Sequence, residues 1–213
     1  MNRTIAVAFT GASGLPYGLR LLDCLLASGA RVWLTYSAAA RTVAQLEDGV
    51  DLPAIPAEGK RLLAERYGAK DGQLEVFGVM DWTAPMASGS NPPDALVVCP
   101  CSMTTLARIA AGLADDLIAR AADVALKEGR KLIVVPRETP LSAIHIENML
   151  RVSRAGGVIL PPSPGFYHRP TSVAALVDFV VARILDQLAI KHTLMARWGA
   201  SPASASDADV PTN

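Results

Sequence analysis

The stretch "TIAVAFTGASGLPYGLRLL" (residues 4–22) runs from an apolar segment through a glycine-rich turn into a leucine-rich segment. The apolar segment predicts a buried strand over 4–9, and the leucine-rich segment predicts a helix over 15–27. A glycine-rich turn between a strand and a helix usually binds a phosphate group. This turn matches neither GxGxxG nor GxxxxGK[ST], and it presents a serine, Ser13. The stretch therefore predicts an α/β fold with an anionic ligand of a kind that the common fingerprints do not specify.

The same alternation of apolar runs and helical patterns continues along the chain. Runs such as "ALVVC" and "KLIVVP" are apolar throughout, which is typical of a parallel sheet covered on both faces. We therefore expect a single α/β domain with a doubly wound parallel sheet and right-handed crossovers. The predicted strands are 4–9, 31–36, 74–77, 95–99, 131–136 and 158–160, and the predicted helices are 15–27, 38–47, 58–67, 103–111, 115–128, 142–153 and 173–188. Segments 82–94 and 161–170 are predicted loops, and the small, polar residues 199–213 predict a disordered tail.

The composition excludes several classes of protein. Among 213 residues, 20 Lys and Arg balance 20 Asp and Glu, which argues against a broad surface for nucleic acid or anionic membranes. The first apolar run is too short for a signal peptide, and no run reaches transmembrane length, so we expect a soluble cytoplasmic protein. Cys24, Cys99 and Cys101 lie in apolar surroundings and are expected to be reduced core thiols. The apolar share of 51% exceeds what one small globule readily hides, which favours a large homo-oligomer.

Polar motifs follow the predicted strands at their carboxyl ends, where open α/β sheets bind their ligands. They are "GASG" (11–14), "YSAAA" with Ser37, "SMTT" (102–105) and "PRET" with Arg137 and Glu138. The first and third of these can direct helix N-termini at an anion, although each also fits an ordinary helix cap. Arg137 beside Glu138 suits phosphate binding with proton transfer, and a structural salt bridge is the alternative.

Three further basic residues stand out on helical patterns. Arg183 falls on an apolar face of the helix predicted at 173–188, where a buried guanidinium needs a partner or must reach solvent. Arg120 and Lys127 share one face of the helix predicted at 115–128. An ordinary i,i+4 pair between Asp123 and Lys127 is the alternative to a ligand-binding role there.

The chain shows no metal-binding pattern. Asp115 and Asp116 do not extend to the aspartate-rich DDxxD motif, so Mg²⁺-dependent ionisation of a diphosphate is not indicated. The histidines at 145, 168 and 192 show no pairing typical of metal ligands and are expected to be structural or exposed.

The motifs taken together resemble one family. "TGASGLPYGLRLL", "ASGS", "CPCSMTTLA", "RAADVALKE", "PRETPLS", "HIENML", "PGFYHRP" and "ARW" occur in the order typical of the UbiX family of flavin prenyltransferases, from about residue 4 to Trp198. The resemblance implies one domain over 1–198 with a flavodoxin-like Rossmann fold, assembled as a dodecamer. It also implies a metal-independent reaction that joins dimethylallyl phosphate to N5 and C6 of reduced FMN. The product, prenylated FMN, serves UbiD-type decarboxylases.

The resemblance also assigns site residues. FMN contacts would be Gly11, Ala12, Ser13, Ser37, Ser102, Met103, Thr104, Thr105 and Arg137. The prenyl phosphate would lie against Tyr167 and Arg183, with Lys127, Glu138 and Arg120 near its phosphate and Trp82 and Trp198 walling the prenyl pocket. The catalytic residues implied are Ser13, Glu47, Lys127 and Glu138. Glu47, which ends a helical pattern, also fits an ordinary surface position.

Two rival functions stay open. The wider group includes flavin-containing cysteine decarboxylases, which use a catalytic histidine and a "PASANT"-like segment. The comparable stretch here reads "MASGSN", and no histidine lies in "GASG" or "CPCSMTT", which disfavours that activity. The other rival is an FMN-binding protein with no chemistry of its own.

Overall fold

The computed structural model describes residues 3–195 and contains a six-stranded sheet in the order β3-β2-β1-β4-β5-β6. Every neighbouring pair of strands is parallel. The strands are β1 (Thr4–Phe9), β2 (Arg31–Tyr36), β3 (Leu74–Phe77), β4 (Ala95–Cys101), β5 (Lys131–Pro136) and β6 (Val158–Ile159). The predicted parallel sheet is confirmed.

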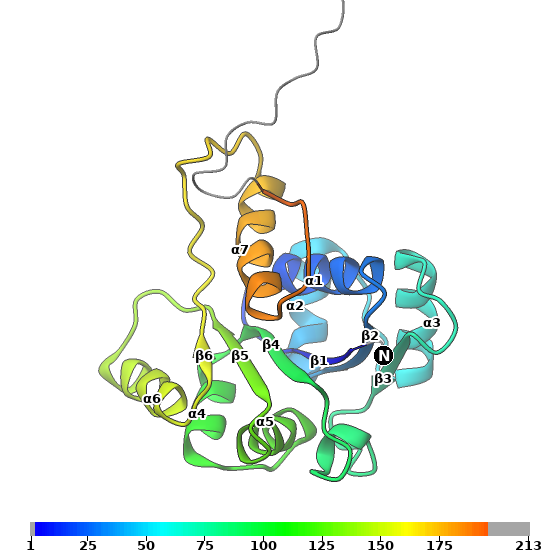
Figure 1. Ribbon diagram of the computed structural model, residues 1–213, viewed down its shortest axis with the longest axis vertical. Coiled ribbons are helices and arrows are strands. Elements are labelled where there is room, and N and C mark those ends of the chain that lie inside the picture. Colours follow the sequence, from blue (N-terminus) through cyan, green and yellow to red (C-terminus); the bar gives the residue numbers. More distant parts are fainter. Residues whose placement is uncertain (1–2, 196–213) are drawn as a thin grey trace, which may run out of the picture.

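Helices cover both faces of this sheet, as Figure 1 shows. The helices are α1 (Leu15–Ala27), α2 (Ala38–Asp48), α3 (Pro56–Tyr67), α4 (Met103–Ala111), α5 (Leu117–Lys127), α6 (Ala143–Arg154) and α7 (Val173–Gln187), with a short 3₁₀ helix η1 (Pro85–Ala87). Buried side chains of α1, α2, α3 and α7 form one core with the sheet, and those of α4, α5 and α6 form the other. The fold is therefore a doubly wound α/β sheet of the flavodoxin-like type, as predicted.

The boundaries differ from the prediction where capping and pairing decide them. The helix predicted at 115–128 begins at Leu117, because the Asp116 side chain accepts a hydrogen bond from the Ala119 N–H at 2.8 Å and caps it. The strand predicted to end at residue 99 continues to Cys101, with a register shift after Val98. This extension carries the chain further toward the carboxyl edge of the sheet.

Some expectations concern residues beyond this fold. The predicted tail 199–213 and Trp198 lie outside the described residues, so the domain boundary at residue 198 stays a prediction. Within residues 3–195, no helix combines the length and apolar character needed to cross a membrane. The three cysteines are free, and Cys99 and Cys101 are buried, as predicted.

Candidate functional site

The ends of β1, β4 and β5 are tied together at the carboxyl edge of the sheet. The Thr10 hydroxyl donates to the Pro100 carbonyl oxygen at 2.8 Å and accepts from the Ser102 N–H at 2.8 Å. The Arg137 Nε donates to the Ser13 carbonyl oxygen at 3.0 Å. These bonds hold the turn after β1 beside the start of α4 and the end of β5, so three of the predicted motifs lie side by side.

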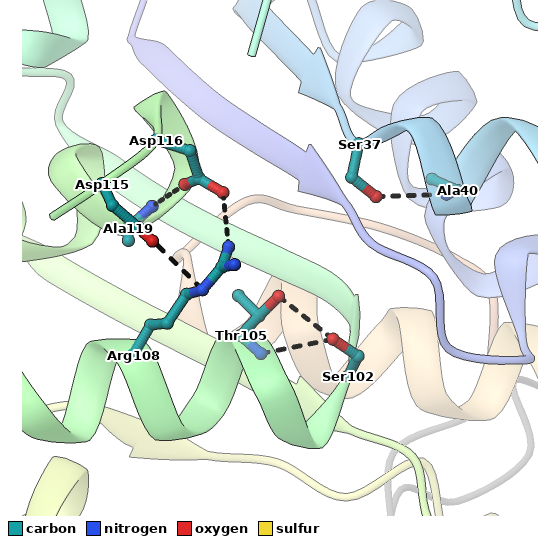
Figure 2. A network of polar contacts seen from close by, with 8 residues as sticks. All are labelled: Ser37, Ala40, Ser102, Thr105, Arg108, Asp115, Asp116 and Ala119. Carbon is teal, nitrogen blue, oxygen red and sulfur yellow. Dashed lines mark hydrogen bonds and ion pairs between the residues drawn. The ribbon is translucent and has the colours of Figure 1, made fainter. Parts of the chain in front are cut away.

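Two serines cap helices at this edge, as Figure 2 shows. The Ser37 hydroxyl accepts from the Ala40 N–H at 3.1 Å, and the Ser102 hydroxyl accepts from the Thr105 N–H at 3.3 Å. Ser102 Oγ also lies 3.1 Å from Thr105 Oγ1. Both serines are therefore helix caps. A cap of this kind still leaves first-turn N–H groups without a partner inside the helix, so α4 offers Met103 and Thr104 amides to an anion.

The turn after β1 packs closely on the first turn of α2. A Cβ atom added at Gly11 would lie 2.4 Å from the Ala39 Cβ, so only glycine fits there. Ala12 is buried, and Gly14 has a φ of +105°, which other residues rarely adopt. The glycines of this turn therefore allow a backbone path that brings Ser13 to the start of α1.

Glu47, near the end of α2, reaches the N-terminus of α1. Its Oε2 accepts from the Gly14 N–H at 2.9 Å and the Leu15 N–H at 3.4 Å. Partial burial acts to raise the pKa of Glu47. The hydrogen bonds from the Ser13 hydroxyl and from the Gly14 and Leu15 amides, with the charge of Arg137, outweigh that effect and lower the pKa below its ordinary value. Glu47 is therefore a carboxylate at neutral pH, in contact with Ser13.

Glu138 lies next to this site but makes no salt bridge with Arg137. Its side chain is exposed, and its Oε1 accepts from the Thr139 N–H at 3.1 Å. The structural ion pair considered from the sequence is therefore absent between these two described residues, and the carboxylate faces solvent.

Lys127 lies near the amino end of β5, whereas these groups lie at the carboxyl ends of the strands. It ends α5, four residues before β5 begins at Lys131, whereas Arg137 and Glu138 follow the end of β5. The intervening strand is roughly 20 Å long. The prediction that Lys127 joins Arg137 and Glu138 around one phosphate is therefore not met within a single copy of the chain.

The pairing of charges on α5 also differs from the alternative drawn from the sequence. Asp123 pairs with Arg120 at 2.8 Å rather than with Lys127, which instead contacts Glu128. The Arg120 Nε donates to the Ala87 carbonyl oxygen at 2.9 Å and so attaches η1 to α5. Arg120 thus has a structural role in the isolated chain.

Arg183 and Tyr167 form a third group, on α7 and the loop before it. Arg183 has a partner and also reaches solvent, the two alternatives that its position on an apolar helix face predicts: it pairs with Asp186 at 2.8 Å and its side chain is half-exposed. It lines a pocket of about 330 Å³ whose other walls, from Val158 to Ser163 and on α7, are mainly apolar. Tyr167 is exposed and contacts Phe179 edge-on, with ring centroids 5.8 Å apart.

The remaining predicted residues are exposed or take part in ion pairs between helices. Trp82 is exposed, in the turn after β3. Arg108 pairs with Asp116 at 3.0 Å and with Asp115 at 3.6 Å, so this acidic pair joins α4 to α5 (Figure 2). In the part of the chain from 3 to 195, no group of three or more His, Cys, Asp or Glu side chains is arranged to hold a metal ion.

The sequence analysis missed Thr10 as a site residue. Thr10 stands in the quoted turn and is 1% exposed, yet a threonine at the end of a strand is common and gives no sign of its partners. The signal that could have identified it is the combination of a buried polar residue with an unpaired N–H at the start of the neighbouring helix. That combination is visible only when β1 and β4 are placed side by side.

Comparison with known proteins assigns the chain to a family. The family model named Flavoprotein matches residues 1–185. The flavin prenyltransferase UbiX of Pseudomonas aeruginosa is 56% identical over 195 residues, covering 92% of this chain and 93% of that protein.

Two solved structures are also similar over nearly their full lengths. One is a UbiX protein (PadA1) in complex with FMN and dimethylallyl pyrophosphate, with a TM-score of 0.84 and 40% identity over 95% of this chain and 100% of that one. The other is a dodecameric FMN-dependent UbiX-like decarboxylase from Escherichia coli O157:H7, with a TM-score of 0.82 and 43% identity over 92% of this chain and 100% of that one. These matches extend across the elements that build the site, and the chain belongs to the UbiX flavin prenyltransferases within the flavoprotein family.

Proposed function

We propose that this protein transfers a dimethylallyl group from dimethylallyl phosphate to N5 and C6 of reduced FMN. The allylic C–O bond breaks and inorganic phosphate leaves, and the new bonds to the flavin close a ring. Membership of the family supports the activity. The structural observation that carries it is the ionised Glu47 beside Ser13, next to the α4 N-terminus and Arg137.

The chain's residues fit FMN at the carboxyl edge. The N-terminus of α4 supplies amides and the hydroxyls of Ser102 and Thr105 to a phosphate, and Arg137 supplies a positive charge. Gly11, Ala12, Ser13, Ser37, Met103 and Thr104 complete the proposed FMN contacts. FMN, once bound, supplies the nucleophilic N5 and C6.

Proton transfer is assigned to carboxylates at this edge. Glu47 is held ionised by hydrogen bonds and so can accept a proton that Ser13 relays. Glu138 is a second candidate, because its carboxylate makes no ion pair with any residue from 3 to 195 and accepts only from the Thr139 N–H.

We propose that neighbouring copies complete the prenyl phosphate site. Lys127, at the end of α5, lies about one strand length from Arg137 in one copy, and Arg120 and Arg183 are held in pairs with Asp123 and Asp186. Packing of copies against one another would bring these cations to one phosphate, where they stabilise its developing charge. The dodecameric relative from Escherichia coli supports an assembly of this kind, and we propose a homododecamer.

The aromatic residues would protect the departing prenyl group. Trp82, Tyr167 and Trp198 can stabilise an allyl cation by roughly 1–2 kcal/mol each when desolvated, and they cannot capture it as water could. Transfer of the product to a UbiD-type decarboxylase and a cytoplasmic location remain predictions, as does the absence of a metal requirement.

A mass spectrum distinguishes this function from its rivals. Reduced FMN is incubated with the protein and dimethylallyl phosphate, with the diphosphate in a parallel sample and a chelator in both. A gain of one prenyl unit on FMN is the expected result. Unchanged FMN would contradict the proposal and leave a cysteine-type decarboxylase or a non-catalytic FMN-binding protein.

A further inference from the structure

The chain reverses direction at the C-terminal end of α7 through a strained turn. The Ala189 N–H donates to the Asp186 carbonyl oxygen at 3.0 Å, and the Ile190 N–H donates to the Leu185 carbonyl oxygen at 3.0 Å. These two bonds form a Schellman motif, in which the residue after the C-cap adopts the left-handed conformation. That residue is usually glycine, whereas here it is Ala189 with a φ of +53°. The turn brings residue 192 back against the helix.

After this turn, His192 contacts the carboxylate of Asp186, which also binds Arg183. Asp186 Oδ2 accepts from Arg183 Nη1 at 2.8 Å, and Asp186 Oδ1 lies 3.1 Å from His192 Nε2. An ionised carboxylate only accepts hydrogen bonds, so Nε2 carries the proton in this contact. Each oxygen of Asp186 is therefore engaged by a different side chain.

His192 is an unusual choice for a position that serves packing alone. Its side chain is only 10% exposed, and within residues 3–195 its buried Nδ1 has no hydrogen-bond partner. An apolar residue would avoid the unpaired nitrogen, but it would leave Asp186 Oδ1 without this donor. The contact with Asp186 is thus the interaction that the imidazole provides here.

The carboxylate holds a guanidinium that faces a pocket. Among the described residues that line the pocket of about 330 Å³ beside β6, Arg183 is the one charged residue. Its pair with Asp186 uses Nη1, and in the described part of the chain Nε and Nη2 have no hydrogen-bond partner. Those two nitrogens remain available to a phosphate, whose oxygens match the guanidinium edge.

We infer that Asp186 and His192 are positioning residues, which hold the Arg183 guanidinium in the orientation that binds the phosphate of the prenyl substrate. The inference rests on the proposed function, in which Arg183 contacts that phosphate. A half-exposed arginine loses considerable rotamer freedom when it binds an anion, and a side chain already held in place loses less. The negative charge of Asp186 opposes the phosphate, but the carboxylate is partly exposed and therefore screened.

The test compares two aspartates on the same helix. Asp186→Asn is expected to raise the KM for dimethylallyl phosphate roughly three- to tenfold, because binding must then order one long side chain. The kcat and the affinity for FMN should change little. Asp178→Asn is the control, because Asp178 pairs with Arg20 of α1 at 2.7 Å. The control should lower the melting temperature without changing the KM.

Substitutions of His192 separate hydrogen bonding from packing. His192→Gln keeps an N–H donor near the position of Nε2, whereas His192→Leu removes it, so the KM should rise more in His192→Leu. An unchanged or lower KM in Asp186→Asn, or an equal rise in Asp178→Asn, would overturn the inference. Failure of the wild-type protein to bind or prenylate at all would instead reject the proposed function, so the two failures are distinguishable.

Discussion

At the scale of single residues, two buried threonines show how position decides what a hydroxyl does. Thr10 and Thr35 are 1% and 0% exposed. The Thr10 hydroxyl joins β1 to β4 through Pro100 and Ser102, whereas Thr35 Oγ1 has no hydrogen-bond partner within the described residues. The same side chain therefore stabilises the site in one place and carries an unpaired oxygen in the other.

This contrast predicts opposite effects of the same substitution. Thr10→Val leaves the Ser102 N–H without its partner, so we expect a loss of about 1–3 kcal/mol in the free energy of unfolding and weaker FMN binding. Thr35→Val removes an unpaired polar atom and should be neutral or stabilising by up to roughly 1 kcal/mol. Urea denaturation and a flavin titration measure both effects. Equal losses in the two variants would contradict the assigned role of Thr10.

Glu47 predicts a pH dependence of stability. Because its pKa is lowered in the folded protein, its contribution is present above the ordinary pKa near 4.5 and is lost as the pH falls through the lower, folded value. Glu47→Gln should therefore destabilise the protein at pH 7, by less than about 1 kcal/mol because the side chain is largely exposed. Melting curves should show that the difference from wild type shrinks below pH 4.5. A constant difference across this range would show that the charge is not the cause.

At the scale of elements, the Schellman motif that ends α7 has an alanine where a glycine is usual. Ala189 occupies the left-handed position that glycine normally fills, and this conformation costs an L-residue about 1–2 kcal/mol. Ala189→Gly should therefore stabilise the protein by roughly 0.5–1 kcal/mol, since glycine relieves the strain but loses more backbone entropy on folding. The free energy of unfolding measures the gain.

The control for this substitution lies in the same helix. Ala182 is buried in the right-handed interior of α7, so Ala182→Gly should destabilise the protein by about 1 kcal/mol or more. If both glycine variants were destabilised alike, the turn at Ala189 would not be strained.

At the scale of the whole molecule, α6 exposes three large apolar side chains to solvent. Ile144, Ile146 and Leu150 are 68%, 55% and 47% exposed, whereas Val152 is the buried residue of this helix. Scattered exposed apolar residues are normal, but several on one helix are typical of an interface. A homo-oligomer would cover them and, on the proposed function, would also bring the cations of α5 and α7 to the site of a neighbouring copy.

We therefore expect substitutions on α6 to weaken self-association. Ile144→Ser combined with Leu150→Ser should lower the mass measured by light scattering from that of a large oligomer. If neighbouring copies complete the phosphate site, as proposed above, prenyl transfer should fall with it. Ile55→Ser, just before α3 on the other side of the sheet, is the control, because Ile55 is 55% exposed and so is comparable to each of the two residues changed on α6. A monomeric wild-type protein at working concentration would contradict the prediction.

The sequence by itself determined the sheet, its covering helices and the edge that carries the site. Apolar runs and helical patterns are local, and the carboxyl ends of parallel strands lie together, so the sequence predicts that Ser13, Ser37, Ser102 and Arg137 share that end of the sheet. The glycine-rich turn after the first strand was predicted too, whereas the positive φ of Gly14 and the close contact at Gly11 appear only in the structure.

Only the tertiary structure decided which side chains pair. Glu47 reaches the start of α1 from the far end of α2, Asp123 pairs with Arg120 rather than Lys127, and His192 returns to Asp186. The partners of Glu47 and His192 depend on distances between segments that no local pattern contains. Asp123 has possible partners three and four residues away on its own helix, and the side-chain rotamers decide between them. The separation of Lys127 from Arg137 differs from these cases, because the predicted helix at 115–128 and strand at 131–136 already place the two residues at opposite ends of one strand.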